Sequence, residues 1–270
     1  KVAETVRAVD DDWLVFAELD PFSGFQGHGF PKGTPERTVN ASHWYDIVTL
    51  STKTFMYPVA FNPFSGKSIE GPDAIRDSYV KQLGRIKEAS ASLGGAPTLI
   101  GEFGIPYDLD EAAAYKAWAA GDRSADPWDK HVIALDLMYD AMDALMLHTA
   151  QWNYTASNSN DQATGDQWNQ EDLSIFSRDQ QSDPKNPDSG GRAVAGFCRP
   201  YLRACQGVPV SMRFDRASGA FELVYDADPA VPGATCTPSS SPIKVLRTGA
   251  GNAPSAVNCL RKFWMPAVAT

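Results

Sequence analysis

The chain of 270 residues lacks any apolar run of the roughly 18–20 residues that a helix needs to span a bilayer. Its longest candidate, Val132 to Leu147, is interrupted by Asp136, Asp140 and Asp143 and is typical of an amphipathic helix. The sequence therefore predicts no transmembrane segment. Transient contact with a membrane surface remains open as an alternative.

Clusters of Lys and Arg are also lacking, and the formal net charge is −9. A protein that binds DNA or RNA needs a basic face to displace the counterions of the phosphates, so we expect no nucleic-acid partner. An acidic surface fits a neutral substrate such as a sugar, and it fits simple solubility equally well.

Cysteine is scarce and confined to the last third of the chain, at Cys198, Cys205, Cys236 and Cys259. No C-x-x-C spacing of a metal site occurs, so we expect no metal. Two disulfides in an exported protein and four free thiols remain open as alternatives. No signal peptide is visible, which leaves the compartment open, with secretion favoured.

The first part of the chain alternates apolar runs with helical stretches. Four strands are expected, at residues 13–19, 37–45, 97–103 and 150–154. The nearly continuous apolar run 13–19 is typical of a strand buried on both faces. Helical spacing of apolar residues is present at 73–92 and 129–147. Such alternation predicts parallel strands with crossover helices, which is an α/β fold. Because a complete (β/α)8 barrel takes about 250 residues, residues 1–178 are expected to form an open sheet or the second half of a barrel.

The composition changes after residue 178. Residues 179–192 are polar and rich in Pro, Gly and Ser, which predicts a linker or long loop. Short strands are expected beyond it at 208–214, 220–225 and 243–246, with a hairpin connection at 216–219. Residues 193–270 are therefore predicted to form a small antiparallel β-sandwich domain.

Glu102 is the leading candidate for a catalytic residue. It lies at the carboxyl end of a predicted strand, between Gly101 and Phe103-Gly104. Parallel α/β barrels carry their catalytic residues at that end of the strands. A carboxylate after an apolar strand needs a partner or a role, and a simple ion pair with Lys or Arg is the structural alternative.

His43 and Tyr45 lie at the end of the preceding predicted strand and, two residues apart, point to the same face. The hydroxyl of Tyr45 is placed to donate to Glu102, which would keep that carboxylate ionised and oriented as a nucleophile. An aromatic pair that caps the core is the structural alternative.

Trp152 lies at the end of the last predicted strand, with Asn158 and Asp161 close behind. A tryptophan there is suited to the floor of a sugar subsite, and the Asn and Asp side chains are suited to binding sugar hydroxyls. A core tryptophan followed by an Asx-rich turn is the alternative.

These residues resemble glycoside hydrolase family 5, and within it the endoglycoceramidase and glucosylceramidase-like branch. The GEFG motif around Glu102 is similar to the nucleophile strand of the family. His43 and Tyr45 are similar to the pair at the end of its sixth strand, and Trp152 to the tryptophan of its eighth. Residues 152–176 are similar to the pattern of this branch, in which a small β domain also follows the barrel.

The resemblance implies that residues 1–178 are strands five to eight of a (β/α)8 barrel. It implies a retaining β-glycosidase that hydrolyses the β-glucosidic bond between sugar and lipid in glycosphingolipids or related glycolipids. Glu102 would be the nucleophile and Tyr45 would orient it. His43 and Trp152 would bind substrate along with Asn158 and Asp161, and no cofactor is implied.

One departure from the family pattern concerns the general acid/base, which the family carries in an Asn-Glu-Pro motif after its fourth strand. No Asn-Glu-Pro occurs in this sequence. We therefore expect the acid/base on the amino-terminal half of the same enzyme. Glu18 is a poor substitute because its position matches strand five.

Two alternative functions remain. One is a family 5 β-glucanase, which should have an open cleft lined with aromatic side chains. The other is a non-catalytic fragment that binds glycan or lipid. The apolar loop Thr54 to Gly66 is suited to a lipid tail, and it equally fits a loop packed on its own barrel.

Overall fold

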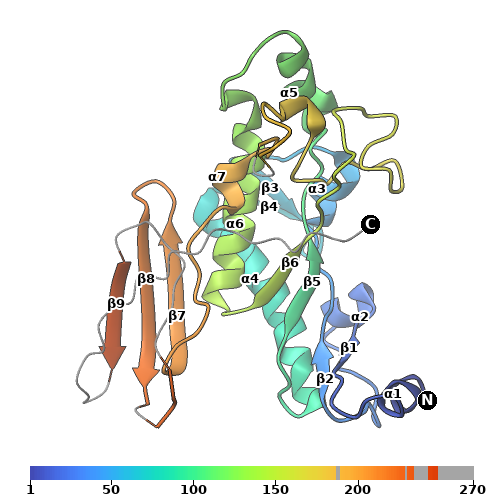
Figure 1. The fold of residues 1–270 in the computed structure, drawn as a ribbon, viewed down its shortest axis with the longest axis vertical. Helices are drawn as coiled ribbons and strands as arrows, with labels where there is room; N and C mark the ends of the chain where they lie inside the picture. The colour runs from blue at the N-terminus through green and yellow to red at the C-terminus, as the bar shows by residue number, and fades with distance from the viewer. Residues whose placement is uncertain (187–188, 229, 234–242, 249–270) are drawn as a thin grey trace. The chain divides into compact units, whose positions relative to one another are not determined.

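The computed structural model spans residues 1–270 and describes residues 1–186, 189–228, 230–233 and 243–248 (Figure 1). The chain separates into two compact units, Lys1–Phe197 and Cys198–Thr270. Segment 179–192, predicted to be a linker or loop, lies within the first unit and ends at a fully buried Arg192. Of the two predicted alternatives, a linker or a long loop, the segment is a loop of the first unit.

Short parallel strands form the centre of the first unit (Figure 1). They are β1 (Val15–Ala17), β2 (Thr38–Asn40), β5 (Leu99–Phe103) and β6 (His148–Gln151). Strand β1 pairs with β2, β5 pairs with β6, and a parallel bridge between Asn40 and Thr98 joins the two pairs. The predicted α/β class and parallel pairing are confirmed. Among the described residues the strands do not close into a barrel.

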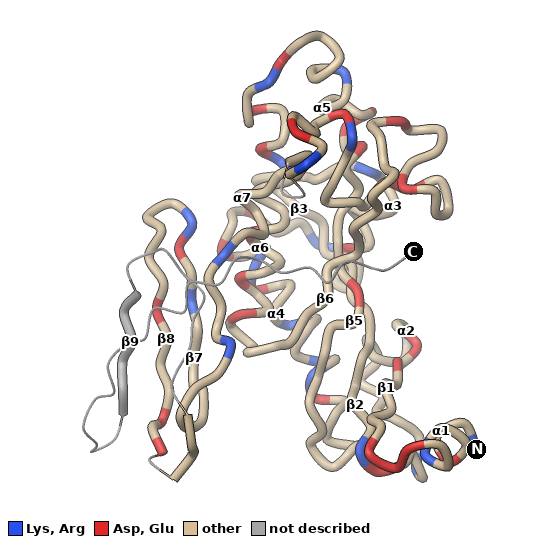
Figure 2. Tube along the Cα trace, in the orientation of Figure 1, with Lys and Arg blue, Asp and Glu red and all other residues tan. Residues whose placement is uncertain are grey.

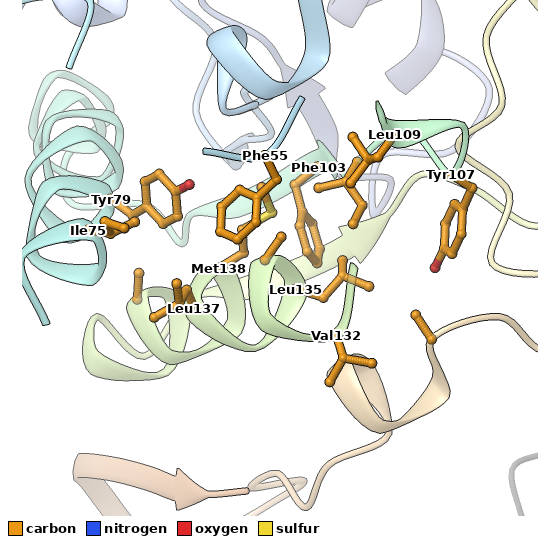
Figure 3. Close-up of a cluster of buried hydrophobic side chains, with 14 of the residues drawn as sticks. Phe55, Ile75, Tyr79, Phe103, Tyr107, Leu109, Val132, Leu135, Leu137 and Met138 are labelled. Atoms are coloured by element: carbon orange, nitrogen blue, oxygen red, sulfur yellow. The ribbon is translucent and has the colours of Figure 1, made fainter. Parts of the chain in front are cut away.

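Two long helices cross between these strands and bury the main core. They are α4 (Pro72–Ala89) and α6 (Asp129–Ala144). The predicted apolar side of α4 is confirmed, because Ile75, Tyr79, Leu83 and Ile86 are each at most 4% exposed. Figure 3 shows side chains of α6, such as Leu135 and Met138, directed toward the aromatic residues Phe55 and Phe103. This packing fixes β5, whose carboxyl end carries Glu102.

The expected loop Thr54 to Gly66 contains a β-hairpin in the structure. Strands β3 (Val59–Asn62) and β4 (Lys67–Glu70) pair antiparallel, and the Asn62 side chain accepts hydrogen bonds from the backbone of the connecting turn. No clear alternation of apolar and polar residues is present in this segment, because apolar residues occupy both faces of β3 and the residues before it. The inward face packs on the core through Ala60 and Ile69.

Several shorter helices complete the first unit. Helices α3 (Ile47–Thr52) and α5 (Leu109–Ala119) are not among the elements expected from the sequence. The remaining ones are α1 (Val2–Arg7), α2 (Pro21–Phe25), α7 (Val194–Phe197) and the 3-10 turns Ser90–Leu93, Asp126–Trp128 and Arg178–Gln180. Asp46 caps α3 by accepting from the backbone N–H groups of Val48 and Thr49, which fixes the chain directly after Tyr45.

The second unit carries a three-stranded sheet in the order β7 (Gly207–Asp215), β8 (Ala220–Ala227) and β9 (Ile243–Thr248). The β7–β8 hairpin is antiparallel as predicted, and Gly219 in its turn has a positive φ of 70°. Strand β9 instead pairs parallel with β8, so the prediction of a purely antiparallel domain is wrong. The long connection between β8 and β9 permits this pairing, which a tight hairpin forbids.

The cysteine prediction is only partly within the described residues. Cys198 and Cys205 are free thiols, whereas Cys236 and Cys259 lie outside the described residues. The second sheet of the predicted sandwich likewise has no counterpart in the strands that the structure describes.

Charged residues of both signs are interspersed along the described chain (Figure 2). An acidic run at residues 10–12 lies beside Arg37, which contacts Asp11 and Asp12. Within the described ranges, no helix is long and apolar enough to cross a membrane.

Candidate active site

Glu102 lies on β5 between two segments that hydrogen-bond to it on either side. The backbone N–H of Gly101 donates to Ser42, and that of Trp44 donates to the carbonyl of Glu102. On the other side, the N–H of Trp152 donates to the carbonyl of Phe103. The segments that follow β2 and β6 therefore meet at the carboxyl end of β5.

The two glycines of the GEFG motif permit this close approach. A Cβ on Gly101 would lie 2.6 Å from the carbonyl oxygen of Ala41 and 3.1 Å from the His43 ring. A Cβ on Gly104 would overlap the carbonyl oxygen of Trp152. The spacing of the motif thus has a physical cause, because both neighbouring segments pack against bare backbone.

Tyr45 and His43 hold the same oxygen of the Glu102 carboxylate. The Tyr45 hydroxyl donates to Oε2 at 3.1 Å, and Nδ1 of His43 lies 3.3 Å from that oxygen. The other oxygen, Oε1, accepts no hydrogen bond from the described part of the chain, and the side chain is 30% exposed. One carboxylate oxygen is oriented while the second remains accessible.

The pKa of Tyr45 is raised above its usual range. Burial is the largest cause, followed by the charge and hydrogen bond of Glu102 and then by the charges of Glu171 and Asp166. Its hydroxyl therefore remains protonated at neutral pH and serves as a hydrogen-bond donor.

Glu18 is brought into the same cluster. It follows β1, and its Oε1 lies 3.2 Å from Nδ1 of His43. A single imidazole nitrogen thus contacts the carboxylates of both Glu18 and Glu102. The sequence alone gave no reason to expect this contact.

Trp152 lies half-buried just after β6. The returning loop, which begins at Asn153, folds back over this point. The peptide bond between Trp152 and Asn153 is cis. The Asn153 amide donates to the buried carboxylate of Asp166 at 2.7 Å, and Asp166 also accepts from the backbone N–H of Leu173. These contacts fix the returning loop beside Trp152.

The other two residues predicted to bind substrate lie apart from this cluster. Asn158 is fully buried, and its amide donates to the carbonyl of Phe176 at 2.7 Å and to Asp172 at 3.3 Å. Its hydrogen bonds are made inside the protein, and its side chain is not exposed to solvent. Asp161 is exposed and stabilises a local turn through Ala163 and Thr164, as the Asx-turn alternative describes.

Two further carboxylates belong near the cluster and were not predicted as site residues. The charges of Glu171 and Asp166 both reach the Tyr45 hydroxyl. They are distant from Tyr45 in the sequence, and only the returning loop brings them there. The sequence shows several acidic residues within 166–172, but nothing in it indicates that any of them faces Tyr45.

A surface hollow lies at the opposite ends of β5 and β6. It has a volume of about 550 Å³ and is lined by residues such as Pro97, Thr98 and His148, which precede or begin these strands. It contains none of the clustered carboxylates. In the described residues, no group of three or more His, Cys, Asp or Glu gathers to hold a metal ion.

The chain is similar to several known proteins. Residues 199–244 match the family model described as the glycoside hydrolase family 5 C-terminal domain. A glucosylceramidase of Cryptococcus neoformans var. grubii is 28% identical over 220 residues, which cover 76% of this chain. The crystal structure of sterylglucosidase 1 from Cryptococcus neoformans aligns with 81% of this chain at 30% identity and a TM-score of 0.69.

The chain belongs to glycoside hydrolase family 5. An ergosteryl-beta-glucosidase of Saccharomyces cerevisiae, 32% identical over 155 residues and 53% of this chain, is a further relative. The family 5 chain spans only 28% of the length of the glucosylceramidase and 32% of the sterylglucosidase structure. It therefore corresponds to part of these proteins.

Proposed function

We propose that the complete protein is a retaining β-glycosidase that cleaves the β-glucosidic bond between a sugar and a lipid alcohol. In this proposal the present chain supplies strands five to eight of a (β/α)8 barrel and the small β domain. The observation that carries the proposal is Glu102 at the end of β5, with one oxygen held by Tyr45 and His43 and the other accessible.

In the first step, Oε1 of Glu102 forms a bond to the anomeric carbon while the bond from that carbon to the leaving oxygen breaks. A general acid protonates the leaving lipid alcohol. In the second step, that group takes a proton from water, the water oxygen bonds to the anomeric carbon, and Glu102 departs as a carboxylate. The sugar therefore keeps its anomeric configuration, and no cofactor is required.

Tyr45 is proposed to act through its hydrogen bond to Glu102. Because its hydroxyl stays protonated, it donates to Oε2 in the free enzyme and again as the carboxylate departs. Trp152 is proposed to stack against the sugar at the cleaved linkage. His43 supports the site by hydrogen bonding.

The general acid/base is proposed to lie on polypeptide outside this sequence, in the amino-terminal half of the enzyme. Retention requires two carboxyl groups about 5–5.5 Å apart. The chain contains no Asn-Glu-Pro motif, and it spans a minor part of its relatives. Activity is therefore a property that we assign to the complete protein.

The segment that follows Tyr45 supports the proposal that the leaving group is a lipid. This segment carries partly exposed apolar side chains, each at least 40% exposed: Ile47, Met56, Val59, Phe61 and Phe64. An apolar surface of this kind suits a lipid aglycone better than the polar chain of a β-glucan. The relatives, which include a glucosylceramidase and an ergosteryl-beta-glucosidase, support the same proposal.

Substitution of Glu102 tests the proposal in the complete protein. Glu102→Gln should lower turnover of a lipid β-glucoside by several orders of magnitude with unchanged thermal unfolding. A 2-deoxy-2-fluoro glucoside with a good leaving group should label wild type on the peptide that contains Glu102. Near-normal turnover by Glu102→Gln, or a label on another peptide, would show that the assignment is wrong.

Tyr45→Phe gives a graded test of the same site. Loss of a hydrogen bond to a charged group costs about 1.5–3 kcal/mol, which corresponds to roughly a 10- to 150-fold lower kcat. Tyr201→Phe is the matched control, because Tyr201 is 45% exposed in the second unit. Equal rates in the two variants would contradict the proposed role of Tyr45.

A further inference from the structure

One ring nitrogen of His43 lies at ion-pair distance from two carboxylates. Nδ1 lies 3.2 Å from Oε1 of Glu18 and 3.3 Å from Oε2 of Glu102. A carboxylate is attracted to a ring nitrogen that carries a proton, so Nδ1 is the atom through which both side chains act on the imidazole. His43 therefore lies between Glu18 and Glu102 and contacts both.

The fold places Glu18 at this position through the backbone on both sides of it. The carbonyl of Ala17 accepts from the N–H of Ala41, and the N–H of Leu19 donates to the Ser42 hydroxyl at 3.0 Å. The Ser42 hydroxyl in turn donates to the fully buried Asn40 side chain at 2.7 Å. This buried chain of hydrogen bonds sets the register between the ends of β1 and β2.

The ring of His43 is confined from its other side. Gly101 leaves room for it, since a Cβ there would lie 3.1 Å and 3.2 Å from two atoms of the ring. With β5 on one side and Glu18 on the other, the imidazole has two charged acceptors and little space to turn.

We propose that Glu18 is a positioning residue that keeps His43 oriented while Glu102 is bonded to the sugar. This inference rests on the proposed function. When Glu102 forms the glycosyl ester, its carboxylate charge is lost and its attraction for His43 weakens. Glu18 takes no part in the ester and keeps its contact with Nδ1. The imidazole is then in place to donate again to Glu102 as the carboxylate departs.

Glu18 therefore matters most in the second step, the hydrolysis of the glycosyl-enzyme. Glu18→Gln in the complete protein replaces the charged acceptor by a neutral one of the same shape. We expect kcat for 2,4-dinitrophenyl β-glucoside to fall about tenfold. Because kcat/KM reports the first step, KM should fall in parallel and kcat/KM should stay nearly constant. Intact-mass measurement during turnover should show more glycosyl-enzyme than in wild type.

Two variants serve as controls. Glu88→Gln neutralises an exposed glutamate of α4 and should leave all kinetic constants unchanged. Glu18→Asp keeps the charge on a shorter side chain and should give a kcat between those of wild type and Glu18→Gln. Thermal unfolding midpoints of all three variants should match wild type, because Glu18 is 44% exposed.

Two outcomes would overturn the inference. Unchanged kcat and KM in Glu18→Gln would show that His43 needs no second acceptor. Restoration of Glu18→Gln by azide, with a glycosyl azide as product, would instead make Glu18 the acid/base. That role needs consideration because the two carboxylate oxygens on Nδ1 are at most 6.5 Å apart, the sum of 3.2 Å and 3.3 Å. Failure of the proposed function would be recognised by a different result, namely activity that survives the Glu102→Gln substitution.

Discussion

A buried ion pair holds the loop that returns over the site, and its removal is the sharpest test of the fold. Arg192 and Asp172 have side chains that are 0% and 1% exposed. The guanidinium donates to both oxygens of Asp172 and to the Tyr115 hydroxyl, and it lies 4.2 Å from the centre of the Tyr107 ring. The pair links residues 20 positions apart at the end of the loop.

Arg192→Met removes one charge and leaves the other buried. Breaking a buried ion pair from one side lowers the free energy of unfolding by about 3–5 kcal/mol. Asp172 would keep the hydrogen bonds from Tyr115 and Asn158, so we expect a loss near the lower end, about 3 kcal/mol. The double variant Arg192→Met with Asp172→Leu should recover most of this loss, because no unpaired charge remains.

Urea unfolding of the complete protein, followed by tryptophan fluorescence, measures these differences. Arg76→Met is a control of similar size, because Arg76 makes ion pairs with Asp73 and Asp77 at the surface. Such pairs contribute less than about 1 kcal/mol. If Arg192→Met cost no more than Arg76→Met, or if the double variant were less stable than the single one, the reasoning would be refuted.

Two further predictions concern the glycine motif and a buried histidine. Gly101→Ala should destabilise the protein by about 1–3 kcal/mol, since its Cβ would lie 2.6 Å from the Ala41 carbonyl oxygen. Gly84→Ala, with nothing within 4 Å of its Cβ on α4, should stabilise by about 0.5–1 kcal/mol, and midpoints that move in the same direction would contradict this account. Burial lowers the pKa of His131 from 6.5 to about 4, so the unfolded state binds the proton more readily and stability falls as pH drops from 6.5 to 4. The loss should approach about 3 kcal/mol in urea titrations, and His131→Phe should show a smaller pH dependence, whereas an equal slope would exclude His131 as its source.

Much of the fold was predictable because its strands and helices differ in period and in burial. The continuous apolar run before Glu102 indicated a strand buried on both faces, and the spacing of Ile75, Tyr79, Leu83 and Ile86 indicated the buried side of α4. The β3–β4 hairpin was not predicted, since consecutive apolar residues hid its alternation. The parallel pairing of β9 with β8 was missed for a different reason, because strand direction depends on the connection between strands and not on either strand's own pattern.

The candidate site was likewise only partly predictable from the sequence. His43 and Tyr45 could be placed on one face from their spacing of two, and both contact Oε2 of Glu102. Asn158 seemed suited to sugar hydroxyls, yet it is buried and bonded within the loop. An asparagine has the same hydrogen-bonding groups in both roles, so its type and spacing do not distinguish them.

The sequence by itself determined the local features: a glutamate between glycines at the end of an apolar strand, the two donors that face it, and the family to which the chain belongs. These follow from side-chain period, backbone freedom and residue type, which are short-range properties. Only the tertiary structure decided that Glu18 shares His43 with Glu102, and that Arg192 and Asp172 lock the returning loop. Those contacts join residues far apart in the chain, and burial sets their strength by removing water from the charges that they pair.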